Sequence, residues 1–389
     1  MNYHTVENCR LCASPKLEDI LSVCEQRVVE WGNRTPVTVP LEVVKCEECD
    51  LLQLRHTTNP DLLWGENYGY KSGVNQTMRD HLRGIVESTG AKEGDLVVDI
   101  GCNDGTLLSN YPEGVTRVGF EPSRNVGMEA WDKGNVDKLF LDFFSAFPFV
   151  QEYGEHKADV ITAISMFYDL DDPNAFVNDI KRCLKKDGTF IVQQNYLGGM
   201  LEQNAVDNIC HEHVEYYSLK TMQNLLNRHD MEVYKVEFND LNGGSFRTFI
   251  SNKGEKEIDP SVNLKEDFDY SAFAERSREN ADQLHDFIEG ENAKGKRTYV
   301  YGASTRGNTL MQFAHLEGLI PKAMERNPDK YGKDYNGAEM ISEHQGRDEK
   351  PDYLLMLPWF FAEEFVQREK ALAESGTKFI IPLPRMKIL

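Results

Sequence analysis

The stretch Val97-Val98-Asp99-Ile100-Gly101-Cys102-Asn103-Asp104-Gly105-Thr106-Leu107-Leu108 decides the fold. An apolar, β-branched run ends in an acid and a glycine-rich turn and then passes into a helical pattern, so we expect a strand, a loop and a helix. Glycines at positions 101 and 105 allow a tight turn close to a ligand, and the Asp99 carboxylate can accept hydrogen bonds from an ammonium group. This spacing favours the amino-acid end of S-adenosylmethionine over the pyrophosphate of a dinucleotide.

Two later segments extend this site. Residues 116–121 end in Glu121, about 20 residues after the first acid, where a carboxylate can accept hydrogen bonds from both ribose hydroxyls. Residues 138–144 place Asp142 and Phe143 at a strand end, where the acid can bind an adenine amino group and the ring can cover the base. One such turn alone is as consistent with an ordinary capped turn, but acids at three successive strand ends favour a nucleoside cofactor. The pattern resembles class I S-adenosylmethionine-dependent methyltransferases, and it assigns to the cofactor Asp99, Gly101, Asn103, Gly105, Glu121, Asp142 and Phe143.

The composition narrows the function further. A chain of 389 residues can form two or three domains with ample core. Its formal charge of -21 argues against a nucleic-acid partner, because a phosphate backbone requires a basic face, and favours a small-molecule substrate. No apolar run approaches the ~20 residues that span a bilayer, and residues 1–8 lack a charged segment followed by an apolar one. We therefore expect a cytoplasmic protein that does not enter a membrane.

Four cysteines form two knuckles, Cys9-Arg10-Leu11-Cys12 and Cys46-Glu47-Glu48-Cys49. Each knuckle offers two thiolates from one turn, and four thiolates complete a tetrahedral zinc site with no open position, so we expect a structural zinc. The ion would supply folding free energy that so small a segment cannot obtain from a core, and we expect its removal to loosen this segment before it affects cofactor affinity. The alternative is four buried cysteines without a metal.

Between residues 62 and 81 lies a tyrosine-rich loop, Asn67-Tyr68-Gly69-Tyr70-Lys71-Ser72-Gly73-Val74-Asn75. It can either fold over a ligand or pack its tyrosines beneath itself. The core then runs from 82 to 197, with further strands at 158–164 and 189–195. Residues 165–173 follow the first of these strands at the carboxyl edge of the sheet, where ligands bind.

The segment Cys210-His211-Glu212-His213-Val214-Glu215-Tyr216-Tyr217-Ser218 carries the densest group of titratable side chains. It lacks the second histidine of a His-Glu-x-x-His metal site, so acid-base chemistry is the better interpretation. A histidine oriented by a carboxylate is a base near neutral pH and can remove a proton next to a carbonyl. The alternative is two histidines that cap a helix or line a polar turn.

A second α/β unit follows an acidic linker at 252–269 and an exposed helix expected at 270–289. The linker is preceded by Asn242-Gly243-Gly244-Ser245-Phe246-Arg247, which is either a substrate-binding turn or a β-hairpin corner. The unit opens with a strand and Gly302-Ala303-Ser304-Thr305-Arg306-Gly307, a layout that points backbone N–H groups at an anion such as a diphosphate. The lysine of a Walker loop is missing. Strands are expected at 322–325, 353–357 and 378–382, completing a parallel sheet.

Taken together, the chain resembles the nucleotide-sugar C-methyltransferases that act on 4-keto-6-deoxy sugars. The resemblance is carried, in order, by the cysteine knuckles and Cys49-Asp50-Leu51-Leu52-Gln53-Leu54, the cofactor loop, His211-Glu212-His213 with Tyr217-Ser218, Gly243-Gly244-Ser245-Phe246-Arg247, Gly302-Ala303-Ser304-Thr305-Arg306-Gly307-Asn308-Thr309, and Pro351-Asp352-Tyr353-Leu354-Leu355-Met356-Leu357-Pro358-Trp359. It implies an α/β protein with a zinc-binding domain at 1–62, a Rossmann-like class I methyltransferase domain at 63–250 and a second Rossmann-like domain at 251–389.

The resemblance also implies site residues. The second histidine of the motif is the family's proposed base, which maps to His213, and Glu212, His211 and Tyr70 complete the catalytic set. The residues expected to bind substrate are Tyr68, Asp169, Cys210, Tyr217, Arg247, Ser304, Arg306 and Asn308. Four positions depart from the family, since Cys210, Asp169 and Phe360 stand where tyrosine, histidine and asparagine are usual, and Gly73 stands after Ser72 where a second serine is usual.

The expected reaction is transfer of a methyl group from S-adenosylmethionine to the carbon next to the ketone of a nucleotide-linked sugar. A base would form the enolate, and the loop at Arg306 would anchor the diphosphate without binding a second cofactor, because Arg326 stands beside the acid that a ribose would need. Two alternatives stay open. One is an O- or N-methyltransferase, which needs no enolate-forming base, and the other is a binding module with a decayed methyltransferase core.

Overall fold

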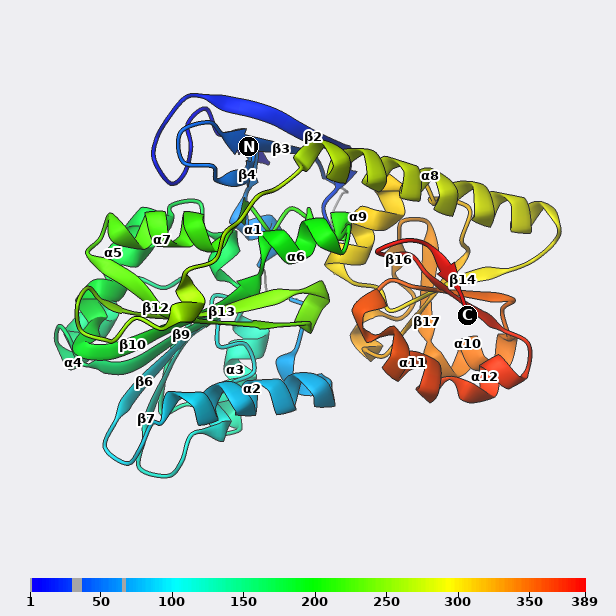
Figure 1. Cartoon of the computed structure of the whole chain (residues 1–389). Coiled ribbons are helices and arrows are strands. Elements are labelled where there is room, and N and C mark those ends of the chain that lie inside the picture. The colour runs from blue at the N-terminus through cyan, green and yellow to red at the C-terminus, as the bar shows by residue number, and fades with distance from the viewer. Residues whose placement is uncertain (1, 30–36, 65–67) are drawn as a thin grey trace.

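A computed structural model describes residues 2–29, 37–64 and 68–389. Figure 1 shows the central domain in cyan and green, the C-terminal unit in orange and red beside it, and the N-terminal strands in blue along one side of both. The chain is an α/β protein, as expected from its strand and helix patterns. Within the described residues, no helix combines the length and the apolar character needed to cross a membrane.

The central sheet has the order β12-β13-β10-β9-β6-β7-β8, and all strands except β13 run in the same direction. Its strands are β6 (Leu96–Ile100), β7 (Thr116–Phe120), β8 (Lys138–Phe140), β9 (Ala158–Ile164), β10 (Leu184–Asn195), β12 (Met231–Asn239) and β13 (Ser245–Asn252). Strands β6 and β9 are apolar runs because helices cover both faces of a parallel sheet. These helices are α2 (Gln76–Thr89), α3 (Arg124–Asp132), α4 (Ala146–Tyr153), α5 (Pro173–Cys183) and α7 (Leu219–Asn227). Connections leave β6 in opposite directions towards β7 and β9, which opens a crevice at its carboxyl end.

The helix expected after Gly105 does not form. In its place the chain makes one 3-10 turn at Leu108–Asn110, with Leu107 and Leu108 buried. Pro112 follows that turn and β7 begins at Thr116, so the chain turns back before a full helix can develop. The cofactor loop is therefore stabilised by its own contacts rather than by a helix behind it.

The N-terminal module is a sheet of order β11-β4-β3-β2, with a separate pair formed by β1 (Tyr3–Thr5) and β5 (His56–Thr58). Its strands are β2 (Leu17–Arg27), β3 (Thr38–Cys46), β4 (Leu52–Leu54) and β11 (Glu215–Tyr216). Strand β11 comes from the segment just after His213 and pairs antiparallel with β4. The sheet thus takes one strand from far beyond the domain boundary predicted at residue 62. The short α1 (Pro60–Leu63) then leads towards the central domain.

The C-terminal sheet has the order β16-β17-β15-β14-β18-β19-β20, with parallel strands in the middle and an antiparallel strand at each edge. Its strands are β14 (Thr298–Tyr301), β15 (Lys322–Glu325), β16 (Asp334–Tyr335), β17 (Ala338–Ser342), β18 (Tyr353–Met356), β19 (Lys378–Ile381) and β20 (Lys387–Ile388). Its helices are α9 (Thr305–Phe313), α10 (Glu343–Glu349), α11 (Ala362–Arg368) and α12 (Lys370–Glu374). This arrangement confirms the second Rossmann-like unit.

The helix expected at 270–289 is present as α8 (Tyr270–Ala293), but the expectation that it is exposed was wrong. Phe273, Ala281, Leu284 and Ile288 recur at helical spacing and are buried. They belong to one apolar core that also contains residues of β2, β3, α6 (Leu197–Glu202) and the C-terminal sheet. Figure 1 shows α8 running from the N-terminal strands across the C-terminal unit, so this helix packs the three parts together.

Candidate active site

A cavity of about 320 Å³ opens at the carboxyl edge of the central sheet, at the crevice beside β6. Its wall comes from the cofactor loop, the ends of β7 to β9, the tyrosine-rich loop and the N-terminal module. The predicted site residues that line it are Asp99, Gly101, Asn103, Glu121, Asp142, Phe143, Tyr68, Tyr70, Asp169 and His211. Strand ends that are far apart in sequence thus converge on a single space because the parallel strands share one edge.

Two buried acids form the floor of the cavity. The Asp99 carboxylate accepts a hydrogen bond from Thr162 Oγ1 of β9 at 2.5 Å, and burial raises the pKa of Asp99 to about 7. The Glu121 carboxylate accepts the backbone N–H groups of Asn103 and Ser123 at 2.9 and 2.8 Å, and burial raises its pKa. Each carboxylate oxygen keeps a lone pair for a ligand. A cation at Asp99 and hydroxyl groups at Glu121 would satisfy both acids.

The glycines of the cofactor loop have different roles. Gly101 lines the cavity with φ of 71°, and a Cβ atom there would lie 3.3 Å from Met166 Cγ. Gly105 does not line the cavity, since a Cβ atom there would lie 2.6 Å from Asn135 Cβ and 3.0 Å from Ala130 Cβ. Gly101 therefore allows approach from the ligand side, whereas Gly105 allows the loop to pack on the protein behind it.

Asp142, the third acid predicted to bind the cofactor, is more exposed than Asp99 and Glu121. The Asp142 Oδ1 atom accepts the backbone N–H of Phe143 at 2.8 Å. The Phe143 ring is 50% exposed and meets Trp64 edge to face, with ring centroids 6.1 Å apart. Both aromatic side chains line the cavity. A planar base would fit against this pair, as expected for the adenine end of the cofactor.

The cofactor loop holds the tyrosine-rich loop over the cavity. The Asn103 side chain accepts the Ser72 N–H at 2.9 Å and donates to the Tyr70 carbonyl oxygen at 3.1 Å. The Asp104 Oδ2 atom accepts the Gly73 N–H at 2.9 Å, and a Cβ atom on Gly73 would lie 2.7 Å from that oxygen. Of the predicted loop, Asn67 lies outside the described residues. The described part follows the first alternative, in which the loop covers a ligand space, although Tyr70 is itself half exposed.

His211 and His213 point to different surroundings. His211 lines the cavity, and its Nε2 atom lies 3.2 Å from the Val39 carbonyl oxygen of β3. His213 is not among the residues that line the cavity; it is buried, with its ring centroid 4.1 Å from that of Tyr168. Its Nδ1 atom lies 2.9 Å from the Asn208 carbonyl oxygen and 3.1 Å from Asn208 Oδ1.

These contacts define the state of His213. Both neighbours of Nδ1 are oxygen acceptors, so Nδ1 carries the proton and Nε2 keeps its lone pair. Burial and then the positive charge of Arg306 lower the pKa of His213 to about 3, while burial lowers the pKa of His211 to about 4. Both rings are therefore neutral at physiological pH, and the Nε2 atom of His213 can accept a proton.

The neighbouring acids form a second group. Asp169 lines the cavity from the 3-10 turn after β9, and its Oδ1 atom is buried with no hydrogen-bond partner among the described residues. Burial and then the charge of Glu212 raise the pKa of Asp169 well above its usual range, and burial also raises the pKa of Glu212. Cys210 is buried nearby. Tyr217 lies away from the cavity and donates to Glu215 at 2.7 Å.

The two arginines predicted to bind substrate, Arg306 and Arg247, both form ion pairs with acidic side chains of the protein. The Arg306 guanidinium contacts Asp207 Oδ2 at 2.9 Å and donates to the Asn242 carbonyl oxygen at 2.6 Å. Asp207 is fully buried and also accepts from Trp359 Nε1 at 3.1 Å. Arg247, in β13, pairs with Gln193 and Glu237 instead of facing the cavity. Both guanidinium groups are thus paired with acids of the protein, although the buried Nη2 atom of Arg306 makes no hydrogen bond within the described residues.

Ser304 and Asn308, the other two residues of the C-terminal unit that were predicted to bind substrate, also have hydrogen-bond partners within the protein. Ser304 caps α9, with its Oγ atom accepting the Gly307 N–H at 3.0 Å. Asn308 is buried and donates to the Arg27 carbonyl oxygen at 3.0 Å while accepting from Asn336. These contacts connect α9 to the N-terminal module and to its own domain.

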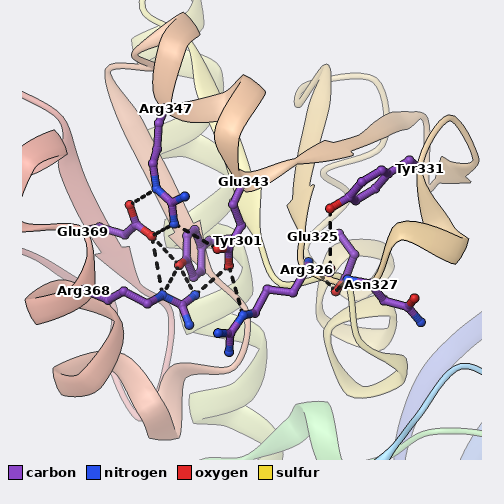
Figure 2. Close-up of polar contacts among 9 residues, drawn as sticks. All are labelled: Tyr301, Glu325, Arg326, Asn327, Tyr331, Glu343, Arg347, Arg368 and Glu369. Atoms are coloured by element: carbon purple, nitrogen blue, oxygen red, sulfur yellow. Dashed lines mark hydrogen bonds and ion pairs between the residues drawn. The ribbon is translucent and has the colours of Figure 1, made fainter. Parts of the chain in front are cut away.

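An ion-pair network occupies part of the C-terminal unit (Figure 2). The buried Glu369 carboxylate accepts from Tyr301 at the end of β14 at 2.7 Å and from Arg347 Nε at 2.7 Å. Arg368 contacts Tyr301 and donates to Glu343 at 2.6 Å. Charge is thus balanced within the network, which ties α10 and the end of α11 to the central strand.

The acid at the end of β15 is also satisfied from within (Figure 2). The Glu325 Oε1 atom accepts the backbone N–H groups of Arg326 and Asn327 at 2.7 and 3.1 Å. Its Oε2 atom lies 3.3 Å from Lys330 Nζ, which also donates to the Ala303 carbonyl oxygen at 2.9 Å. Since a ribose would need this acid, its own loop occupies the place that a nucleotide takes in dinucleotide folds.

The four knuckle cysteines come together as the sequence predicts. Their Sγ atoms all lie within 4.8 Å of one another, with 3.5 Å between Cys9 and Cys49 and 3.6 Å between Cys12 and Cys46. Four sulfur ligands around one point fit a tetrahedral Zn²⁺ ion, whose bonds to sulfur are about 2.3 Å.

Comparisons with known proteins identify the family. Residues 72–236 match a family model described as a methyltransferase domain, and residues 240–384 match one described as the C-methyltransferase C-terminal domain. The C-methyltransferase NovU of Streptomyces niveus is 30% identical to this chain over 419 residues, which cover 99% of this chain and 97% of that protein. The chain belongs to the C-methyltransferase family. It is an S-adenosylmethionine-dependent methyltransferase, as the cofactor loop predicted.

Solved methyltransferase structures match part of this C-methyltransferase. An S-adenosylmethionine-dependent methyltransferase from Aquifex aeolicus is 18% identical, with a TM-score of 0.35, and the match covers 43% of this chain and 88% of that chain. The magnesium protoporphyrin IX methyltransferase of Synechocystis PCC 6803, solved with bound S-adenosylmethionine, is 14% identical with a TM-score of 0.34, covering 45% of this chain and 78% of that chain.

Sequence analysis missed part of the cavity wall of this C-methyltransferase. Thr57, Thr58 and Trp64 reach it from the N-terminal module, and Met166 and Asp171 reach it from the segment after β9. The position of that segment at the carboxyl edge was a signal for Met166 and Asp171. The N-terminal residues had no local signal, because only the pairing of distant strands brings them to the cavity.

Proposed function

We propose that this C-methyltransferase methylates the carbon next to the ketone of a nucleotide-linked keto-deoxy sugar, with His213 as the general base. The observation that carries the proposal is the state of His213, whose Nδ1 atom is held by two oxygens of Asn208. A carbon acceptor must lose a proton before it becomes a nucleophile, and a neutral imidazole with a fixed free Nε2 atom can take that proton. O- and N-methylation do not require such a base.

The residues of this chain would share the work as follows. Asp99 and Glu121 would hold the amino-acid and ribose parts of S-adenosylmethionine, and Asp142 with Phe143 its base. When bound, the cofactor supplies an electrophilic methyl group. His213 would remove the proton from the carbon next to the ketone, and the two loops that Asn103 joins would keep water away from the resulting enolate.

The proposed sugar pocket lies around Asp169, Glu212 and Tyr68. Burial raises the pKa of Tyr68 well above its usual range, and the charges of Glu212 and Asp169 raise it further, so its hydroxyl group stays protonated and can donate to a sugar oxygen. Cys210 and Asp169, which depart from the family pattern, lie in this group.

That Arg306 anchors the diphosphate stays a prediction, and such binding would cost free energy because Arg306 is already paired. An incoming anion would compete with Asp207, and separating a buried ion pair by removing one partner costs about 3–5 kcal/mol. The satisfied Glu325 supports the related proposal that the C-terminal unit binds no second nucleotide cofactor. We also propose that the four cysteines hold a structural zinc.

Deuterium exchange tests the proposed base. In D₂O, the wild-type enzyme should exchange the proton next to the ketone of a nucleoside-diphosphate-linked 4-keto-6-deoxyhexose, and His213→Gln should slow both exchange and methylation by ~10²–10⁴-fold. His344→Gln is the control, because that side chain is 85% exposed and pairs only with Asp348 in the described structure. A His213→Gln enzyme that retains most of its activity and places the methyl group on oxygen or nitrogen would contradict the proposal.

A further inference from the structure

Arg10 connects the cysteine cluster to the cofactor cavity. It lies between Cys9 and Cys12, and its side chain is 2% exposed. Its Nε atom donates to Asp171 Oδ1 at 3.1 Å, and its Nη2 atom donates to Thr57 Oγ1 at 2.7 Å. Its Nη1 atom donates to the Leu54 carbonyl oxygen at 2.6 Å. All three nitrogen atoms of the Arg10 guanidinium group therefore donate a hydrogen bond, and each of these acceptors lies outside the Cys9–Cys12 knuckle.

Two of these partners form part of the cavity wall. Thr57 and Asp171 both line the cavity, and the Thr57 hydroxyl donates to the same Asp171 oxygen at 2.6 Å. Asp171 belongs to the segment after β9 that also carries Asp169 and Leu170, two further lining residues. A shift of the Arg10 guanidinium would thus move this part of the cavity wall, because the Asp171 carboxylate accepts hydrogen bonds from both Arg10 and Thr57.

Two further contacts hold the knuckles against the same region. The Asn174 side chain, in the first turn of α5, donates to the carbonyl oxygens of Arg10 and Leu11 at 3.0 Å each. On the other side, β4 follows the second knuckle and pairs with β11, the strand that directly follows the His211–Val214 segment. The knuckles are thus bonded to both segments that form this side of the site.

We propose that Arg10 is a positioning residue for S-adenosylmethionine binding, through which the metal-bound knuckle sets the position of Asp171 and Thr57. A metal at the four sulfurs fixes the turn that carries Arg10, and the buried fork transmits that position to the cavity. This proposal differs from the expectation that metal removal loosens the N-terminal segment before it changes cofactor affinity. Removal should weaken cofactor binding directly. This inference does not depend on the identity of the sugar.

The test is calorimetry of S-adenosylmethionine with full-length variants. Arg10→Gln removes the cation, and we expect the dissociation constant to rise about tenfold, which is the effect of losing one charged hydrogen bond. Arg55→Gln is the matched control, since Arg55 pairs with Asp19 and Glu42 in the same module without lining the cavity. An unchanged dissociation constant in Arg10→Gln, or an equal rise in both variants, would overturn the proposal.

Two additional measurements separate positioning from general stability. If Arg10 acts through Asp171, the double variant Arg10→Gln with Asp171→Asn should bind no more weakly than Asp171→Asn alone. If the losses of binding free energy in the two single variants add up in the double variant, that result would count against the proposal. Chelation of the metal should weaken binding in the wild-type enzyme and change it little in Arg10→Gln, with metal content and circular dichroism recorded for each sample. Should Arg10→Gln fail to fold, Thr57→Val breaks the same link with little change in shape, and unaltered affinity there would refute the idea.

Discussion

Asp99 should make the affinity for S-adenosylmethionine depend on pH. Asp99 is 4% exposed, and its pKa is about 7, because burial and, to a smaller extent, the charge of Glu121 raise it more than the hydrogen bond from Thr162 lowers it. The ammonium group of the ligand needs the ionised carboxylate. The ionised fraction falls from about three quarters at about pH 7.5 to about 3% at about pH 5.5, so the dissociation constant should rise about 20-fold over that range.

Calorimetry with S-adenosylhomocysteine measures this directly, because that ligand has the same amino-acid end and no reactive methyl group. Asp99→Asn should bind weakly and with little dependence on pH across the same range. Glu121→Gln, which changes the ribose-binding acid, should keep the pH dependence at lower affinity. A flat profile in the wild-type enzyme, or a sloping one in Asp99→Asn, would refute the assignment of the ammonium group to Asp99.

The same carboxyl group should affect folding with the opposite trend. Its pKa in the folded protein lies above the ordinary aspartate value of 3.8, so the folded state binds more protons than the unfolded state between about pH 4 and pH 7. The free energy of unfolding therefore falls as the pH rises through this window, by at most about 4 kcal/mol for a shift of about three units. Urea unfolding of Asp99→Asn should lack this contribution, and an identical pH profile in both proteins would contradict it.

Three further predictions follow from contacts elsewhere in the molecule. Gly73→Ala should weaken cofactor binding and lower stability by about 1–3 kcal/mol, as measured by calorimetry and thermal unfolding, because its Cβ atom would lie 2.7 Å from Asp104 Oδ2. Arg306→Ala should lower the free energy of unfolding by about 3–5 kcal/mol, because it leaves the Asp207 carboxylate buried and unpaired; if Arg306 also anchors the diphosphate, the Michaelis constant for the nucleotide-sugar should rise while cofactor affinity stays unchanged. Elemental analysis should find one zinc per chain, and none after gentle purification would exclude the zinc site.

Much of the fold could be predicted because its strands carry their own signal. Strands buried on both faces are largely apolar runs, so β6, β9 and β18 lie close to their expected positions. The acids at three strand ends converge because parallel strands share one edge, and Asp99, Glu121 and Asp142 all line the cavity. The spacing of the apolar residues and the acids at the strand ends were sufficient to predict these features.

The features that sequence analysis missed depend on partners far along the chain. The pairing of β11 with β4 joins residue 216 to residue 52, and no local pattern encodes it. The buried face of α8 was visible as helical spacing of Phe273, Ala281 and Ile288, but its charged residues suggested an exposed helix. Arg10 reads as a surface cation between two metal ligands until the fold places Asp171 beside it.

The charges around the cavity also limit how a nucleotide-sugar can enter. The acids that line it are Asp99, Glu121, Asp142, Asp169 and Asp171, and no described lysine or arginine lines it with them. A diphosphate would find no cationic side chain among these described lining residues and would be repelled by each lining acid that is ionised, which is destabilising in a space of low dielectric. Under the proposed function, only the reacting sugar enters this cavity, and the diphosphate stays outside it on the side of the C-terminal unit. The acid-rich pocket then favours the positively charged methyl donor and rejects phosphate at the position where the methyl group is transferred.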